Sequence, residues 1–148
     1  MEFISANEFL KQDEKVRQMF LDWWKPSVGD LFSWIKNNYE YENDLRKLEC
    51  CNSDNIVEMT KSFKGINEGD RIPLLTEGQL RKFIEDKTEG KVEFYPDAYH
   101  GERYYTIMIR DSGCGGDDPE FEVDADDVLQ AYWKVAIQIA EQEGKQND

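Results

Sequence analysis

The stretch DDVLQAYWKVAIQIA, residues 126–140, decides how this chain folds. The polar residues that follow its first turn form one narrow stripe: Gln130, Lys134, Gln138 and Glu141. A helix that is apolar around most of its circumference is usually buried on several sides. Asp126 and Asp127 favour a helix start here, because carboxylates complement the positive N-terminal end of the helix dipole. We therefore expect a buried C-terminal helix that packs across a small antiparallel sheet.

Two capping boxes predict two further helices. In the first, Ser5 and Glu8 are spaced so that each side chain accepts a hydrogen bond from the other's backbone amide. The apolar residues behind it recur at helical spacing as far as Trp24, and Pro26 then disfavours continuation. A second box begins at Thr76, and Gly90 is placed to end that helix.

Runs of β-branched and aromatic residues predict the strands. The expected strands are Leu31–Ile35, Ile56–Phe63, Lys91–Tyr95, Tyr104–Arg110 and Glu120–Val123. The polar segment 36–55 predicts a loop with one helical turn at Leu45–Leu48. The sequence therefore predicts a single α+β domain over residues 1–148. Its small antiparallel sheet packs against an N-terminal helix, a short middle helix and the buried C-terminal helix.

Composition indicates an acidic globular protein. The chain has 148 residues, with 18 Lys and Arg against 32 Asp and Glu, which gives a formal net charge of −14. Aromatic residues make up 13% of the chain, and disordered chains lack apolar bulk of this kind. Binding to the nucleic-acid backbone requires clustered Lys and Arg, so this charge argues against direct nucleic-acid binding.

The N-terminus and the cysteines predict a cytoplasmic location. No stretch approaches the roughly 18 consecutive apolar residues of a membrane helix, and no basic region precedes an apolar segment at the N-terminus. The chain has three cysteines, of which Cys50 and Cys51 are adjacent. An odd count with adjacent members does not fit a disulfide framework. We expect neither a membrane nor an oxidising compartment.

Seven acids and no base occur within residues 117–127. If the middle of this run is extended, alternate carboxylates point to one face and the apolar residues between them point to the core. Successive carboxylates would then be about 6.7 Å apart, which is comparable to the phosphate spacing along one nucleic-acid strand. Such a row could imitate a nucleic-acid backbone, or it could be a solvated edge strand that leads into a helix start. The candidate partner-binding acids are Asp117, Asp118, Glu120, Glu122, Asp124, Asp126 and Asp127.

The same region matches a calcium-binding loop only in part. Asp111, Gly116 and Glu122 occupy the first, sixth and twelfth places of an EF-hand-like loop. Gly113 and Gly115 occupy the third and fifth places, where side-chain oxygens are needed, and the flanking helices are missing. The spacing of Cys50, Cys51, Cys114 and His100 does not match a closed zinc site. We expect no metal and no cofactor.

The sequence also lacks a catalytic signature. His100 is the single histidine, and no spacing places it beside a nucleophile with an acid behind it. Residues 113–116 lack the lysine and hydroxyl residue of a phosphate-binding loop. No catalytic residues are expected, and we expect a protein that is not an enzyme.

Adjacent tryptophans suggest a second contact point. Trp23 and Trp24 cannot both face inward on one helix, so one is either exposed or packed under the loop that follows. An exposed Trp24 beside Pro26 would be a partner-binding anchor.

Three blocks of the chain carry a resemblance: FLDWWKPSVGDL at 20–31, IPLLTEGQLRKFIE at 72–85 and LQAYWKVAIQIA at 129–140. In this order they resemble small, largely uncharacterised accessory proteins of phages and prophages of low-GC Gram-positive bacteria. The resemblance covers most of the chain, except segments 36–71 and 96–125. It implies a phage protein that works in the host cytoplasm, and it brings no catalytic residues.

Charge and resemblance together predict an acidic binding protein. Its expected partner is a host protein with a basic surface, such as a defence nuclease of the CRISPR effector type, which it would inhibit by nucleic-acid mimicry. One alternative is a phage structural or assembly module whose acidity serves solubility alone and whose working surface is apolar, around Trp24. Another is an anti-defence protein that binds a small anionic molecule, for which Arg103 and Arg110 offer two cations.

Overall fold

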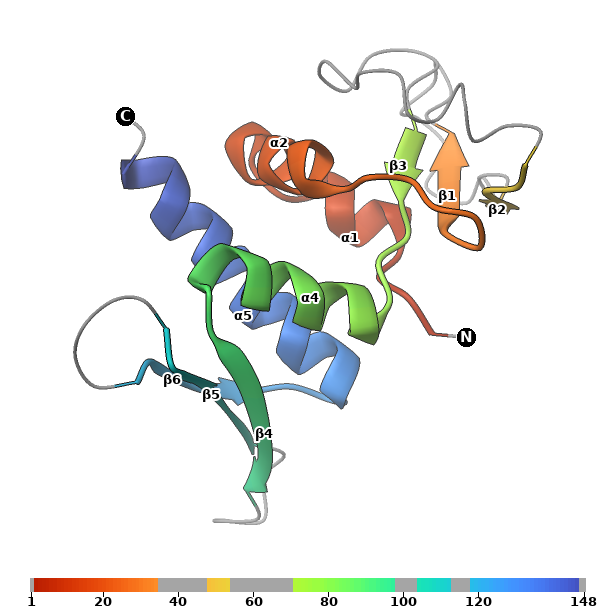
Figure 1. The fold of residues 1–148 in the computed structure, drawn as a ribbon. Helices are drawn as coiled ribbons and strands as arrows, with labels where there is room; N and C mark the ends of the chain where they lie inside the picture. Colours follow the sequence, from red (N-terminus) through yellow and green to blue (C-terminus); the bar gives the residue numbers. More distant parts are fainter. Residues whose placement is uncertain (1, 35–47, 54–70, 98–103, 113–117, 147–148) are drawn as a thin grey trace. The chain divides into compact units, whose positions relative to one another are not determined.

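The chain forms two compact units in a computed structural model that describes residues 2–34, 48–53, 71–97, 104–112 and 118–146. One unit is Ser5–Leu75, and the other combines Met1–Ile4 with Thr76–Asp148. Each unit contains helices and short antiparallel strands, so the α+β class is confirmed (Figure 1). The expectation of one domain stays a prediction, and the two units are described separately.

In the unit Ser5–Leu75, two helices replace the single N-terminal helix predicted from the sequence. The Ser5 capping box is confirmed and begins α1 (Ala6–Leu10), and α2 (Glu14–Trp23) follows an extended residue at Asp13. The ring centroids of Phe9 and Phe20 are 6.2 Å apart in an edge-to-face contact. Eleven residues of one straight helix would separate them by about 16 Å along the axis. The break at Asp13 therefore allows the two helices to pack their buried phenylalanines together.

A three-stranded antiparallel sheet completes this unit. Its order is β2-β1-β3, with β1 (Leu31–Trp34) between β2 (Leu48–Cys50) and β3 (Arg71–Pro73). The sequence predicted β1 with the correct first residue, Leu31, and did not predict β2 or β3. Leu48 starts a strand rather than ending the expected helical turn. The rest of that turn, and the strand expected at Ile56–Phe63, lie outside the described residues.

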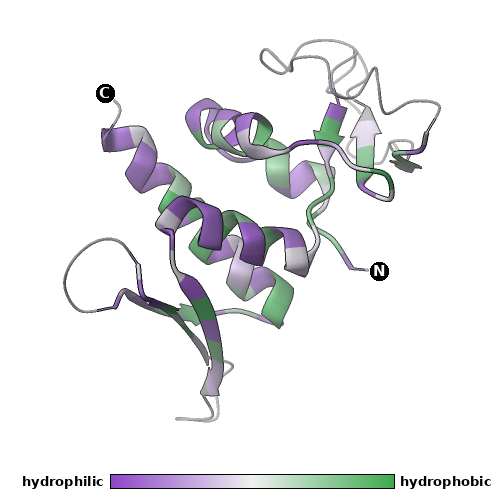
Figure 2. Cartoon of the chain, viewed as in Figure 1, coloured by the Kyte–Doolittle hydropathy of each residue, from purple (hydrophilic) through white to green (hydrophobic). Residues whose placement is uncertain are grey.

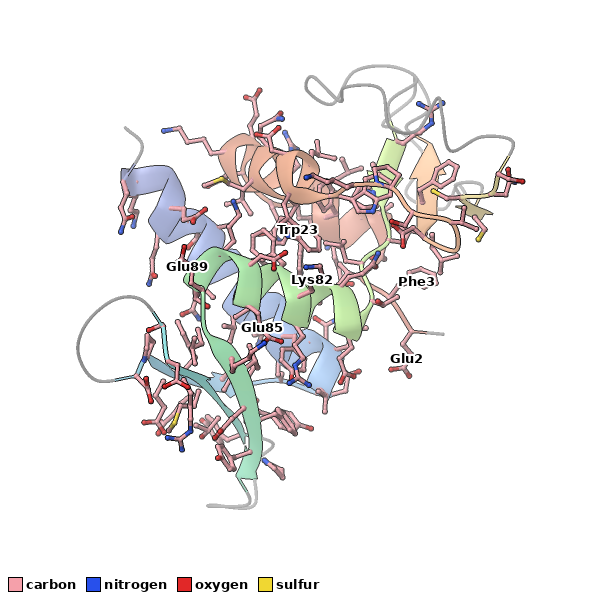
Figure 3. All side chains as sticks on the ribbon, in the orientation of Figure 1. Glu2, Phe3, Trp23, Lys82, Glu85 and Glu89 are labelled. Carbon is pink, nitrogen blue, oxygen red and sulfur yellow. The ribbon has the colours of Figure 1, made fainter. Side chains whose placement is uncertain are left out.

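The unit that contains residues 76–148 begins with a helix on a second capping box, as the sequence predicted. Thr76 caps α4 (Glu77–Thr88), whose inward stripe is Leu80, Phe83 and Ile84. The left-handed residue that ends α4 is Glu89, with φ 58°, and not Gly90. Glu89 is labelled where α4 ends in Figure 3. A Cβ at Gly90 would lie 2.4 Å from Ile109 Cγ2, so glycine serves close packing at this position.

The second sheet has the order β4-β5-β6 and is antiparallel throughout. Its strands are β4 (Lys91–Asp97), β5 (Tyr104–Arg110) and β6 (Glu120–Asp124). All three strands were predicted, and the structure extends β4 by two residues and β6 by one. The described strands thus form two sheets rather than the single small sheet expected from the sequence.

Helices α4 and α5 (Val128–Gln146) pack on one side of this sheet (Figure 1). The first two-thirds of α5 are mainly hydrophobic and its C-terminal end is hydrophilic (Figure 2). Tyr132 is buried, and its ring centroid lies 6.1 Å from that of Phe94 on β4, which in turn stacks on Tyr105 of β5. Burial raises the pKa of the Tyr132 hydroxyl. The predicted buried C-terminal helix is confirmed, and it continues past Ala140 to Gln146.

Candidate functional site

One side of the second sheet is covered by α4 and α5, and the other side carries the candidate site. We call this other side the open face. Antiparallel register places its side chains together, because residues that oppose each other point to the same side. The open-face residues with described side chains are Lys91, Glu93, Tyr95, Tyr104, Thr106, Met108, Arg110, Glu120, Glu122 and Asp124.

The predicted alternation in the acidic run is confirmed along β6. Glu120, Glu122 and Asp124 are exposed, whereas Val123 between them is 5% exposed and Phe121 is half-buried. Across the ladder the three acids oppose Met108, Thr106 and Tyr104, none of which carries a charge. No ion pair or side-chain hydrogen bond to their carboxylates occurs among the described residues. We call these three residues the carboxylate row.

The carboxylate of Glu93, on β4, is in contrast compensated. Arg110 Nε lies 2.7 Å from Glu93 Oε2, and the Tyr95 hydroxyl donates to the same oxygen. The hydrogen bonds that Glu93 accepts, first from Arg110 and then from Tyr95, lower the pKa of the Glu93 carboxyl. The same bond to Glu93 is the main cause that raises the pKa of the Arg110 guanidinium. Arg110 neutralises Glu93, and Lys91 Nζ lies 3.7 Å from Glu85 Oε2 of α4, so the uncompensated carboxylates among the described open-face side chains are those of the carboxylate row.

Two other predicted acids stabilise local structure. Asp127 Oδ1 accepts a hydrogen bond of 2.8 Å from the amide of Gln130, so it caps α5. Asp118 Oδ1 accepts one of 3.2 Å from the amide of Asp111, and its other oxygen lies 3.8 Å from Arg110 Nη1. Asp111 itself has a left-handed backbone, with φ 57°. The Asp127 contact agrees with the alternative interpretation of the acidic run, in which its last acids serve a helix start.

Of the remaining two acids of the run, the structure describes one. Asp126 is exposed at the start of α5, where its charge complements the helix dipole. Asp117 lies outside the described residues. The sequence offered all seven acids as candidate contacts, and the structure separates the carboxylate row from the acids that hold a turn or a helix end.

Trp24 is not an exposed anchor. Its side chain is 4% exposed and packs with Phe32 and Cys51, and its Nε1 donates to Asp30 Oδ2 at 3.1 Å. The prediction of an exposed Trp24 is therefore wrong. The alternative, in which the tryptophan packs under the following loop, is the observed one. Trp23 is half-buried against the same cluster.

The other candidate ligands do not assemble among the described residues. Cys50 is exposed and Cys51 is buried, and both are free thiols. Burial, with a smaller effect of Asp30, raises the pKa of Cys51 to about 11. No group of three His, Cys, Asp or Glu side chains gathers in a metal-binding arrangement within the described ranges. His100, Arg103, Cys114 and the glycines of the EF-hand-like loop lie outside those ranges.

The sequence did not single out Glu93 and Tyr95, and it offered Arg110 only as a cation for a small anionic ligand. Glu93 and Tyr95 are two residues apart in a predicted strand, so their position on one face could have been inferred. Their contact with Arg110 could not, because it depends on the register between β4 and β5. Tyr95, at 45% exposure, is one of the two most exposed large hydrophobic side chains of the described residues.

Comparison of the chain with family models, curated proteins and solved structures gives no match. None of the described helices is long and apolar enough to cross a membrane.

Proposed function

We propose that this chain is a non-enzymatic binding protein whose open face occupies a basic, nucleic-acid-binding surface of another protein. The observation that supports this function best is the carboxylate row, three exposed and uncompensated acids on one strand. They span about 13 Å in steps of about 6.7 Å, a spacing that suits a groove built for phosphates.

Electrostatics favour such a partner. A net charge of −14 attracts a basic surface at long range and accelerates association. This attraction is screened beyond about 10 Å at 0.1 M salt, so binding should weaken as salt rises. Close to the row, neutral Met108, Thr106 and Tyr104 leave each carboxylate available to an incoming Lys or Arg.

In biological terms, the proposed activity is inhibition of a host defence nuclease in the bacterial cytoplasm, with the protein encoded by a phage. The support for this setting is the resemblance of the three sequence blocks to phage accessory proteins. Competition with nucleic acid for a basic groove requires no catalytic residue and no cofactor. The burial of Trp24 disfavours the assembly module, because that alternative used Trp24 as its apolar working surface.

The test compares two variants of equal charge change. E120Q/E122Q/D124N neutralises the carboxylate row, whereas E77Q/E89Q/E141Q removes three exposed acids of α4, its C-cap and α5. Each protein is immobilised and used to capture proteins from host lysate at low and high salt. A captured nuclease is then tested for DNA binding in the presence of each variant.

The proposal expects the wild type and the helix control to displace DNA from the captured protein. Loss of the row should weaken binding about tenfold or more, if each exposed pair contributes about 0.5 kcal/mol or more. Equal binding by all three proteins, or a partner that does not handle nucleic acid, would contradict the proposed function.

A further inference from the structure

The register of β6 determines which of its backbone groups face its partner strand. Ile109 N donates to Pro119 O at 2.9 Å, so these opposed residues form a hydrogen-bonded pair. Such pairs alternate with non-hydrogen-bonded pairs along an antiparallel ladder. Phe121 and Val123 therefore bond to β5, whereas the amides and carbonyls of the carboxylate row point away from it.

One contact confirms this direction. The carbonyl of Asp124 accepts a hydrogen bond from Lys134 Nζ of α5, which it could not do if it pointed at β5. The amides and carbonyls of Glu120 and Glu122 make no hydrogen bond to any other described residue. The free edge of β6 thus presents two consecutive sets of backbone donors and acceptors, directly beside exposed carboxylates.

The opposite edge of the sheet is protected. By the same alternation, Val92, Phe94 and Pro96 direct their backbone groups outward from β4. Pro96 has no amide to offer, and Arg81 Nη2 occupies the Val92 carbonyl at 3.3 Å. A proline and a capping cation are usual means of preventing strand addition. Among the described residues, the β4 edge is therefore blocked at Val92 and Pro96, whereas the β6 edge is occupied at Asp124 by Lys134 and is open at Glu120 and Glu122.

From this asymmetry we infer that β6 accepts an extended basic segment of the partner protein as a fourth strand. In the added strand, alternate residues would lie on the open face beside Glu120, Glu122 and Asp124, where Lys or Arg fits. The residues between them would lie on the other side, beside half-buried Phe121, where apolar side chains fit. The expected motif alternates basic and apolar residues.

Charge also disfavours a second copy of this chain as the occupant. Antiparallel pairing of β6 with another β6 would place acids opposite acids, and like charges directly opposite are destabilising. The inference rests on the proposed function, because it uses the same carboxylate row, and it adds the mode of contact. Main-chain hydrogen bonds would supply affinity, and the alternating side chains would supply specificity.

The test uses two end-blocked peptides of equal composition, KVKVKVK and KKVVVKK, with the full-length protein. Two variants separate backbone from charge. E122Q and E122P lose the same carboxylate, but E122P also loses the outward amide while leaving the β5–β6 hydrogen bonds in place. Circular dichroism checks that both variants fold.

We expect the wild type to bind KVKVKVK about fivefold more tightly than KKVVVKK, and E122P to bind it about fivefold more weakly than E122Q. The amides of Glu120 and Glu122 in the wild-type protein should gain protection from hydrogen exchange when KVKVKVK is added. The hydrogen-exchange measurement uses only the wild-type protein, so it tests the inference even if E122P does not fold.

Equal affinities of E122P and E122Q, with no gain of amide protection, would overturn strand addition. If E120Q/E122Q/D124N still loses binding in that case, the charge-based function survives its failure. If the row can be neutralised without effect, the proposed function fails first. A dimer that forms without peptide and dissociates in E122P would identify a second copy as the occupant and overturn the inference.

Discussion

Arg110 and Glu93 are diagonal neighbours across β4 and β5, and their side chains are 2.7 Å apart from Nε to Oε2. In the register, Glu93 is opposite Met108 and Arg110 is opposite Lys91. The ion pair therefore connects two neighbouring residue pairs on the same face of the sheet. Tyr95 donates to the same carboxylate. The contact orders one end of the open face, and it means that Glu93 does not add to the uncompensated negative charge of that face.

Replacing this arginine should raise the pKa of Glu93 toward its ordinary value. Folding lowers the pKa of Glu93, so the ionised carboxyl stabilises the folded protein at pH values above the pKa of the unfolded state. This stabilisation is lost as the pH falls through the lower pKa of the folded state. Wild-type protein should therefore lose more stability than R110Q on acidification below about pH 4.5. Titration by NMR of the Glu93 side chain, with urea unfolding at several pH values, measures both effects. An unchanged Glu93 pKa in R110Q would contradict the assignment.

Gly90 and Gly78 give a matched pair for close packing. A Cβ at Gly90 would lie 2.4 Å from Ile109 Cγ2 and 2.8 Å from the Arg110 carbonyl oxygen, whereas one at Gly78 would meet nothing within 4 Å. G90A should cost about 1–3 kcal/mol of unfolding free energy through overpacking. G78A, in the first turn of α4, should be neutral or stabilise by up to about 1 kcal/mol. Chemical denaturation of both variants checks this, and equal stabilities would refute the packing argument.

The helices were predictable because their signals are local. Ser5 and Thr76 start helices where their capping boxes predict them, since a box needs four residues and no tertiary partner. The break at Asp13 was not predictable, because it depends on the contact of Phe9 with Phe20. Strands β2 and β3 are three residues each, too short for a periodic pattern, and they exist through pairing with β1.

The two described cysteines should differ strongly in reactivity. Burial raises the pKa of Cys51 to about 11, so little thiolate is present at pH 8, and its side chain is 1% exposed. Cys50 is exposed. In a C114S background, Cys50 should react with a disulfide reagent much faster than Cys51 does. C50S and C51S variants assign the two phases, and equally fast labelling of both thiols in folded protein would be the contrary result.

The candidate site was only partly readable from sequence. Alternation correctly placed Glu120, Glu122 and Asp124 on one exposed face, because a strand repeats every two residues. It also placed Asp127 at a helix start, but it could not assign Asp118 a structural role, because that role depends on a contact with Asp111. Nor could it show that β6 forms an edge, which depends on strand order.

Trp24 should matter for stability and not for binding. W24F removes the indole that donates to Asp30 and leaves space beside Phe32 and Cys51, so it should cost about 1–3 kcal/mol. Because the tryptophan is buried, the folded variant should capture the same partner as the wild type. Denaturation and the capture assay are run together. A stable W24F protein that has lost its partner would revive Trp24 as a contact residue.

Asp127 and Glu122 separate the structural acids from the binding acids. D127N keeps a side-chain oxygen for the Gln130 amide, whereas D127A removes the cap and should cost about 0.5–2 kcal/mol. E122Q changes an exposed side chain that forms no hydrogen bond or ion pair with another described residue, so its stability should stay within about 0.5 kcal/mol of the wild type. Affinity should follow the opposite order: E122Q weakens partner binding and D127N does not. If D127N and E122Q weaken it equally, total charge rather than the carboxylate row governs recognition.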